Sequence, residues 1–562
     1  MYKRQVRRSY PDGSALELTH NVVRVQTQEG ADAFGEFQLP PGATLWRIRT
    51  LKADGRVLEP EEIAGKDSLS LPNLRPGDAL EFEYVRTLPP SDAAPGGFSS
   101  DRFYFRGFEV PYDRSEYVVV VPREMELTVD PRGPAPTLAR AERGGLIEYR
   151  WMVRQSDRMT PEPRSVMARE FIPSIAAGFG ATWERLVDAL RSRLIEQDPA
   201  DPEALALARH ITRAARTPSQ RLLQLHHWVL ENIQQEGAGT PFEVAPRMVA
   251  ARSGHRTRVL CYLLKQVDVP CEIALVRQGS ADSTPSQLAD DETYQSLLLR
   301  VRTEAGEQWV TAADANAPTL YVPPATAGGE ALVLAAGAPR TRVSPLDISA
   351  HGRQLTVSLA LSADGSGRAT VLERLRGYAA TGARSAMRRL DAANRDRQFE
   401  AYVGAMVSGA TLESLVVEGT EDVEADMVFR YTFRAPGIAR RDGERLRFDG
   451  MFRAEAGRAY AELPSREHPQ WNGDPVNASL SLTVRLPEGA AVGSLPTDAG
   501  EESVGGVRWS LRWRSDASGF SVERRVAVPT GRVAPDDSPA FATALRALDT
   551  ADTREVSITL RR

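Results

Sequence analysis

The chain has 562 residues, which is long for a single hydrophobic core and predicts two to four domains. Its 42% hydrophobic and 26% charged residues are ordinary for a folded globular protein. The 70 basic and 75 acidic residues are interspersed and give a formal net charge of -5. This balance provides neither a broad basic face for nucleic acid nor a polybasic run for a membrane surface.

The cysteine content and the lengths of the apolar runs further narrow the class of protein to which the chain can belong. The two cysteines, Cys261 and Cys271, are too few for a disulfide framework, although a single bridge between them is compatible with the sequence. No run of about 18 apolar residues is present, so no transmembrane helix is predicted. Residues 1–5 lead directly into strand-like sequence without the apolar stretch of a signal peptide. This start suggests the hypothesis that the true N-terminus, with an export signal, lies upstream.

Residues 1–155 are predicted to form a β-sandwich. Turn signals such as Asp54-Gly55 recur at short intervals. Between them lie segments such as Leu80–Val85, whose apolar side chains fall on one face at period two. Residues 156–179 are irregular and contain three prolines, so they are predicted to be a linker on the surface.

Residues 180–343 are predicted to form a middle domain that begins with helices. After Thr182, apolar residues recur at spacings of three and four, which is typical of an amphipathic helix. Asp201-Pro202 and Thr217-Pro218 each supply an N-cap and a proline at the first helical position. The domain is therefore expected to open with three helices.

The second half of this middle domain is predicted to be a helix followed by three antiparallel strands. An apolar helix follows Arg252–Thr257 and extends to Val267. Strands are expected at about Pro270–Arg277, Tyr294–Val301 and Gln308–Thr311.

Residues 344–562 return to strand patterns and are predicted to form a C-terminal β-rich domain. A helical insert is expected at about Ala379–Leu390 and Arg395–Met406, and a last helix at Pro539–Leu548. The acidic stretch Glu418–Asp426 is predicted to be a solvated edge. The whole chain is thus expected to belong to the α+β class.

Several short sequence motifs resemble motifs of known protein families. Leu51–Glu59 resembles the Asp-Gly-Arg hairpin of the DUF3857 domain. Leu263-Leu264 with Val269-Pro270 resembles the end of the core helix in bacterial transglutaminase-like proteins, and Trp309-Val310 resembles the start of their third core strand. Those cores belong to the papain-like cysteine-hydrolase superfamily. The resemblance implies a DUF3857-like β-sandwich, a transglutaminase-like core and a β-rich C-terminal domain.

This resemblance also implies a catalytic triad in the order Cys, His, Asp. Thiol acyl transfer needs a thiolate at a helix N-terminus, an imidazole beside it and an orienting carboxylate. None of these groups stands at the matching positions: the cysteine position falls on Ser253 or Arg256, the histidine position on Ser296 and the aspartate position on Thr311. The neighbours expected in this degenerate cleft are His255, Trp309 and Asp314.

Other residues do not replace the missing triad. Cys261 lies one to two turns inside the predicted helix among apolar neighbours, where burial raises the pKa of a thiol, and both cysteines are interpreted as small buried hydrophobes. A serine triad built on Ser253 or Ser296 lacks a histidine on the core strands. The sequence therefore favours the loss of acyl-transfer chemistry.

His226-His227 is the most conspicuous candidate for a metal site. A zinc-binding helix usually carries histidines four residues apart, whereas adjacent side chains point about 100° apart. We expect one packed and one exposed histidine. The sequence predicts neither a metal nor another cofactor.

The sequence predicts a non-catalytic pseudoenzyme whose old acyl-donor cleft binds a peptide or cell-envelope ligand, or which serves as an assembly scaffold. The resemblance implies that the protein is located in the periplasm or cell envelope of a Gram-negative bacterium. The alternative is an active transglutaminase-like cysteine hydrolase or acyltransferase with a displaced triad. The two differ in whether Cys261 is a reactive thiol.

Overall fold

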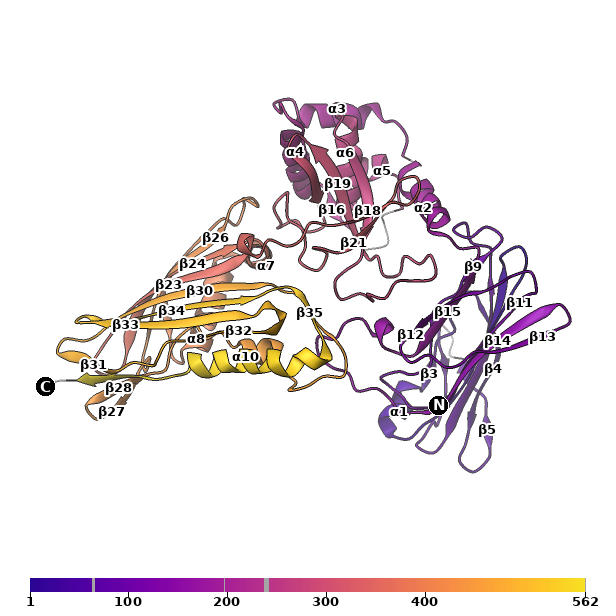
Figure 1. Ribbon diagram of the computed structural model, residues 1–562, viewed down its shortest axis with the longest axis horizontal. Helices are drawn as coiled ribbons and strands as arrows, with labels where there is room; N and C mark the ends of the chain where they lie inside the picture. Colours follow the sequence, from indigo (N-terminus) through magenta and orange to yellow (C-terminus); the bar gives the residue numbers. More distant parts are fainter. Residues whose placement is uncertain (63–65, 197, 237–241, 561–562) are drawn as a thin grey trace.

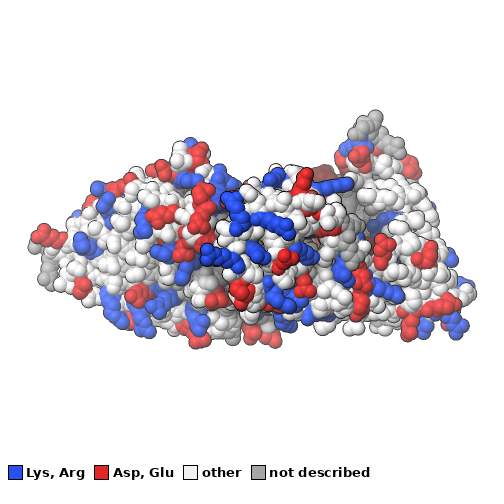
Figure 2. All heavy atoms as spheres, turned by 90° about the horizontal axis from the view of Figure 1, so that it is seen from above, with Lys and Arg blue, Asp and Glu red and all other residues white. Residues whose placement is uncertain are grey.

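The computed structural model describes residues 1–62, 66–196, 198–236 and 242–560. It has three lobes (Figure 1): two strand-rich lobes lie on either side, and a lobe of helices around a small sheet lies above them. Multiple sheets together with helices confirm the predicted α+β class. Basic and acidic side chains are interspersed over the face drawn in Figure 2, without a broad basic area. Among the described residues, none of the helices is long and apolar enough to cross a bilayer.

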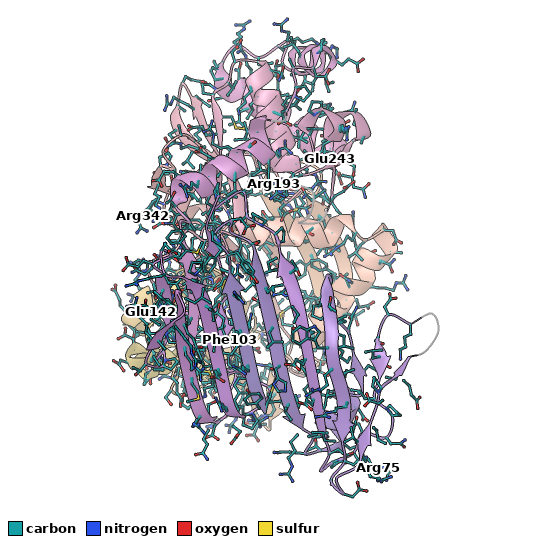
Figure 3. All side chains as sticks on the ribbon, turned by 90° about the vertical axis from the view of Figure 1, so that its right-hand side faces the viewer. Arg75, Phe103, Glu142, Arg193, Glu243 and Arg342 are labelled. Carbon is teal, nitrogen blue, oxygen red and sulfur yellow. A yellow bond between two sulfur atoms is a disulfide. The ribbon has the colours of Figure 1, made fainter. Side chains whose placement is uncertain are left out.

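The N-terminal lobe is a β-sandwich. Its larger sheet has the strand order β13-β14-β11-β1-β2-β8-β4-β5, and the smaller one has the order β10-β15-β12, with β9 also paired to β15. Figure 3 shows the larger sheet below the helices of the middle lobe. The elements are β1 (Tyr2–Ser9), β2 (Ala15–Arg24), α1 (Gln28–Ala33), β3 (Glu36–Phe37), β4 (Ala43–Leu51), β5 (Val57–Leu58), β6 (Glu61–Glu62), β7 (Leu69–Ser70), β8 (Ala79–Leu88), β9 (Phe98–Ser99), β10 (Phe103–Tyr104), β11 (Tyr112–Pro122), β12 (Thr128–Arg132), β13 (Ala139–Arg143), β14 (Leu146–Ser156), η1 (Ala168–Glu170) and β15 (Ser174–Phe179).

Alternating apolar residues build the core of this sandwich. Tyr149 and Trp151 are buried at period two on β14, and Trp151 stacks on Tyr117 of β11 with ring centroids 5.8 Å apart. Phe103, from the smaller sheet, also stacks on Tyr117, with ring centroids 5.1 Å apart. Aromatic rings of both sheets therefore fill the space between them, as the strand pattern predicts.

The prediction of a surface linker over residues 156–179 is wrong at its end. Ser174–Phe179 form β15, the central strand of the smaller sheet, because Ile175 and Ala177 are apolar and are buried in the sandwich. Upstream, Val166 is buried and its N–H donates to the Pro469 carbonyl of the C-terminal lobe at 3.0 Å. The three prolines therefore mark an extended segment that packs between lobes.

The middle lobe combines helices with a five-stranded sheet in the order β20-β19-β18-β21-β22. The three predicted helix starts are confirmed, since Thr182, Asp201 and Thr217 each accept a hydrogen bond from a first-turn N–H. The elements are α2 (Trp183–Arg191), η2 (Ser192–Glu196), α3 (Pro202–Ile211), α4 (Pro218–Asn232), β16 (Gln234–Gln235), α5 (Ala245–Ala251), β17 (Ser253–Gly254), α6 (Arg256–Gln266), β18 (Cys271–Val276), β19 (Ser296–Thr303), β20 (Gly306–Val310), β21 (Glu330–Val333) and β22 (Arg340–Arg342).

The C-terminal lobe is dominated by a sheet with the order β25-β26-β24-β23-β30-β34-β33-β32. The helical insert predicted between its strands is confirmed as α7 and α8, and the predicted last helix as α10. The elements are η3 (Ile348–Ala350), β23 (Gly352–Leu361), β24 (Gly367–Arg376), α7 (Tyr378–Arg388), α8 (Ala392–Met406), β25 (Thr411–Glu418), β26 (Met427–Ala435), β27 (Arg440–Asp442), β28 (Arg445–Phe448), α9 (Ala456–Tyr460), β29 (Gln470–Asn472), β30 (Val476–Arg485), β31 (Ala490–Ser494), β32 (Ala499–Glu502), η4 (Val504–Gly506), β33 (Arg508–Asp516), β34 (Gly519–Val528), β35 (Gly531–Val533), η5 (Pro535–Asp537), α10 (Ser538–Asp552) and β36 (Val556–Leu560).

A buried ionic cluster joins the N-terminal and middle lobes. Asp282, on a middle-lobe loop, pairs with Arg132 of β12 and lies 3.4 Å from Arg169 Nε. Arg132 also donates to Asp130 at 2.8 Å, and Asp130 in turn accepts from the Gln287 N–H at 2.9 Å. The Asp130 and Asp282 side chains are fully buried. Buried charges that lose a partner are costly, so this cluster fixes how the two lobes meet.

The substitution Asp282→Asn should lower the free energy of unfolding by about 3–5 kcal/mol, because it leaves buried guanidinium charge without its carboxylate. Equilibrium denaturation measures the change. Asp188→Asn is the matched control, since Asp188 is exposed and pairs with Arg191 at 3.4 Å on the helix surface. That substitution should lower the free energy of unfolding by less than about 1 kcal/mol. Equal effects of the two substitutions would contradict the role assigned to the cluster.

Candidate functional site

The N-terminus of α6 is the position at which a papain-like core would carry its nucleophile. Ser253 lies just before it on β17, which pairs in parallel with β16, and its hydroxyl hydrogen-bonds the Glu236 carboxylate. The Arg256 Nε donates to the Ile233 carbonyl at 2.7 Å, and burial lowers the pKa of the Arg256 guanidinium. Both predicted cysteine positions are therefore occupied by side chains that bind the backbone and side chains around β16.

The contact between α6 and the end of β20 is made by two hydroxyl groups. Thr257 and Thr311 are both buried, and their Oγ1 atoms lie 3.1 Å apart. The Ala312 N–H donates to Thr257 Oγ1 at 3.1 Å, and the Ala313 N–H donates to Thr311 Oγ1 at 3.2 Å. The structure thus places Thr311, the predicted aspartate position, beside the first turn of α6. Sequence reasoning missed Thr257 because a single threonine in a helix carries no distinctive signal.

The other predicted site residues have separate surroundings. Ser296 begins β19, and its hydroxyl accepts from Gln278 Nε2 at 3.0 Å. Asp314 accepts from its neighbour Asn316 at 2.8 Å, and Trp309 is buried on β20. Burial lowers the pKa of His255, which precedes α6. Among the described residues, no hydrogen bond joins Ser296 to Ser253, Arg256 or Thr311.

Cys261 of α6 and Cys271 of β18 form a disulfide bond, with their Cα atoms 5.7 Å apart. Both cysteines are buried, as predicted, and the bridge that the sequence left open is present. No other cysteine occurs in the chain. A sulfur bound in a disulfide is not a thiolate nucleophile, so neither residue offers one in this structure.

A hydrogen-bond network connects this region to the C-terminal lobe. His226 of α4 is fully buried; its Nε2 lies 3.1 Å from the Thr311 carbonyl oxygen and its Nδ1 lies 3.2 Å from Thr319 Oγ1. Thr319 donates from Oγ1 to Glu424 Oε1 at 2.7 Å and from its N–H at 2.9 Å. His227 Nε2 lies 2.9 Å from the same Glu424 oxygen. The acidic stretch predicted as a solvated edge therefore docks Glu424 onto the middle lobe.

The network sets the charges of its members. Burial lowers the pKa of His226 to about 4, so its ring is neutral. The hydrogen bond with Glu424 raises the pKa of His227. Burial acts to raise the pKa of Glu424, but the hydrogen bonds from His227 and Thr319 outweigh it and hold that pKa at about 2. Of the two adjacent histidines, one is packed as predicted, and the other is only about one-third exposed.

A groove of about 580 Å³ lies between the middle and C-terminal lobes. Its middle-lobe wall comprises residues 307–309 of β20 and residues 320–322, and its C-terminal wall includes residues 423–426. Arg384 of α7 also lines the groove, and its guanidinium donates to the Asn316 and Ala425 carbonyls, each at 2.6 Å. Figure 1 shows α7 next to the loops below the middle-lobe sheet. The groove is thus formed by contacts between lobes that sequence spacing does not reveal.

Residues 11–160 match the family model described as "Domain of Unknown Function with solved-structure structure (DUF3857)", which confirms the resemblance of the N-terminal region. No curated protein matches the chain. A crystal structure of a "putative protease" from Parabacteroides distasonis ATCC 8503 is similar with a TM-score of 0.67 at 12% identity. The alignment covers 100% of this chain and 98% of that one. At this identity the similarity shows a shared fold over all three lobes.

Two further solved structures align with parts of the chain. One is an M1 zinc metallopeptidase from Deinococcus radiodurans, with 14% identity over 31% of this chain and 40% of that one. The other is a "putative cysteine protease" from Cytophaga hutchinsonii, with 10% identity over 39% of this chain and 78% of that one. Both TM-scores are 0.18, which is too low to support a conclusion about fold or activity.

Thr257→Val should lower the free energy of unfolding by about 1–3 kcal/mol, because it leaves the buried Ala312 N–H without its acceptor while preserving side-chain shape. Equilibrium denaturation tests this. Thr543→Val is the control: the Thr543 hydroxyl is exposed on α10 and donates to the Pro539 carbonyl at 2.8 Å. That substitution should change the free energy of unfolding by less than about 0.5 kcal/mol. A Thr257→Val protein as stable as the control would show that the α6–β20 contact is not stabilising.

Proposed function

We propose that this is a non-catalytic, transglutaminase-like protein that binds an extended peptide of a cell-envelope partner in the groove between its middle and C-terminal lobes. The observation that carries the proposal is the composition of the α6 N-terminus. Arg256 and Thr257 lie where a thiolate would be needed, and both are engaged in hydrogen bonds with neighbouring elements.

The side chains described at the N-terminus of α6 do not form a set that could carry out acyl transfer. Thr257 is buried against Thr311, and among the described residues neither hydroxyl is hydrogen-bonded to an imidazole that could take its proton, because the His226 ring nitrogens bind the Thr311 carbonyl and the Thr319 hydroxyl instead. The disulfide removes both thiols from consideration as nucleophiles. The alternative of an active cysteine hydrolase with a displaced triad would require a reduced Cys261 and a histidine beside it.

The groove supports a binding role. Its volume of about 580 Å³ lies within the range of ligand sites. β20 is the edge strand of the five-stranded sheet, so backbone groups on one side of Glu307–Trp309 are not used by the sheet. Leu320, on the same wall, is 56% exposed, which is unusual for a large apolar side chain. An edge strand beside an apolar residue suits an extended peptide that adds to the sheet.

The disulfide supports the proposed address in the periplasm or cell envelope. Disulfide bonds form and persist in oxidising compartments, whereas cytosolic proteins of ordinary bacteria keep their thiols reduced. Cys261 and Cys271 are buried within the middle lobe, so their bridge is structural. The same resemblance that implies the fold also implies export.

Decapeptides selected from a random display library on the native protein test this proposal. A selected peptide should bind with a Kd in the micromolar range by fluorescence polarisation, and it should remain uncleaved and unmodified after prolonged incubation. Leu320→Asp should weaken binding at least about 10-fold, because it places a charge on the apolar wall.

Val416→Asp is the matched control, since Val416 is 52% exposed on β25 and lies outside the groove. It should leave the Kd unchanged. Equal affinity for the two variants would place the peptide elsewhere, and turnover of the peptide would contradict a non-catalytic role.

A further inference from the structure

Three metal-ligating side chains meet where the middle and C-terminal lobes touch. His226 and His227 belong to α4, and Glu424 lies almost 200 residues further along, in the acidic segment before β26. Each offers one ligand atom, and these atoms all lie within 4.8 Å of one another. The two imidazole rings tilt by 55° with centroids 6.2 Å apart, so adjacent helical positions nevertheless bring both rings to Glu424.

The hydrogen-bond pattern leaves one imidazole nitrogen of this cluster, His226 Nδ1, without a hydrogen atom. The Thr311 carbonyl can only accept, so His226 Nε2 carries the hydrogen and Nδ1 carries a lone pair. Thr319 Oγ1 is within hydrogen-bond distance of both this Nδ1 and the Glu424 carboxylate, but a hydroxyl has one proton to donate. Because Thr319 donates this proton to Glu424, the lone pair on the buried His226 Nδ1 is left without a donor.

The surroundings of the cluster favour a cation. Glu424 accepts three hydrogen bonds on a single oxygen, and the carboxylates of Glu231 and Asp422 lie close enough to act on His227. The His227 and Glu424 side chains are 34% and 36% exposed, and Glu424 lines the inter-lobe groove. An ion can therefore reach the cluster from solvent, while the buried His226 ring is held in a fixed orientation by the Thr311 carbonyl.

We propose that His226, His227 and Glu424 form a Zn²⁺ site that joins the middle and C-terminal lobes. Two imidazole nitrogens and one carboxylate oxygen are a donor set typical of zinc, and the Thr319 hydroxyl or a water molecule supplies the fourth ligand. Tetrahedral zinc with bonds of about 2.0–2.1 Å places its ligands roughly 3.3 Å apart. The most distant pair must therefore approach by at most about 1.5 Å, a shift that rotation of the partly exposed His227 and Glu424 side chains can provide.

Bound zinc would replace hydrogen bonds that now hold this corner together. His226 and Thr319 belong to the middle lobe, whereas Glu424 belongs to the C-terminal lobe. A metal between them would fix the acidic segment that forms one wall of the groove. Zinc would act as a structural clip, and its binding would be measurable without any knowledge of the groove's ligand.

Zinc titration of tag-free, chelator-treated full-length protein tests the proposal. Competition against a chromophoric zinc indicator should give one site per chain with a Kd of micromolar or tighter, and saturating Zn²⁺ should raise Tm by about 5 °C. Mg²⁺, which prefers all-oxygen ligands, should do neither. X-ray absorption of the loaded protein should report two imidazole ligands.

His227→Ala and Glu424→Gln should each weaken zinc binding by at least about 10-fold, because even the loss of an outer-shell partner has an effect of this size. His210→Ala is the control, since His210 is exposed on α3 and lies near Arg213. It should bind zinc as the unaltered protein does. Absence of a one-to-one site, or binding that both His227→Ala and Glu424→Gln retain, would overturn the proposal, whereas failure of peptide binding would leave it intact.

Discussion

The pair of buried hydroxyls between α6 and β20 is the contact on which the rest of the middle lobe depends. Thr257 and Thr311 close the space in which a papain-like enzyme would hold its reacting groups, and the Ala312 N–H completes the contact. From Thr311 the network continues through the backbone carbonyl to His226, and through Thr319 to Glu424. A single set of hydrogen bonds therefore links the N-terminus of α6 to the C-terminal lobe.

This arrangement shows which groups occupy the N-terminus of α6. Buried polar backbone groups at a helix N-terminus must find hydrogen-bond partners. The threonine hydroxyls satisfy part of this requirement, and the Arg256 guanidinium binds the Ile233 carbonyl. The Cys261–Cys271 bridge adds a covalent tie between α6 and β18. These contacts together tie α6 to the segment around β16, to β18 and to the end of β20.

Local signals in the sequence were sufficient to predict most helices and strands. They were insufficient to predict most contacts between residues far apart in the chain. Thr182, Asp201 and Thr217 predicted helix starts because capping acts within a few residues. The strand β15 was missed, since three prolines nearby suggested a linker while its burial depends on distant strands. Of the site, the sequence pointed to Thr311, and the structure places this residue beside α6. Glu424 could not be foreseen, because no pattern within the sequence relates it to residues almost 200 positions away.

The disulfide between Cys261 and Cys271 leaves the native protein without a free thiol. Incubation of the native, unreduced protein with excess iodoacetamide near neutral pH, followed by intact mass spectrometry, tests it most directly. The disulfide between Cys261 and Cys271 predicts no adduct before reduction and two adducts after unfolding and reduction. Fast modification of Cys261 at one adduct per chain in the native protein would contradict the account and indicate a cysteine enzyme.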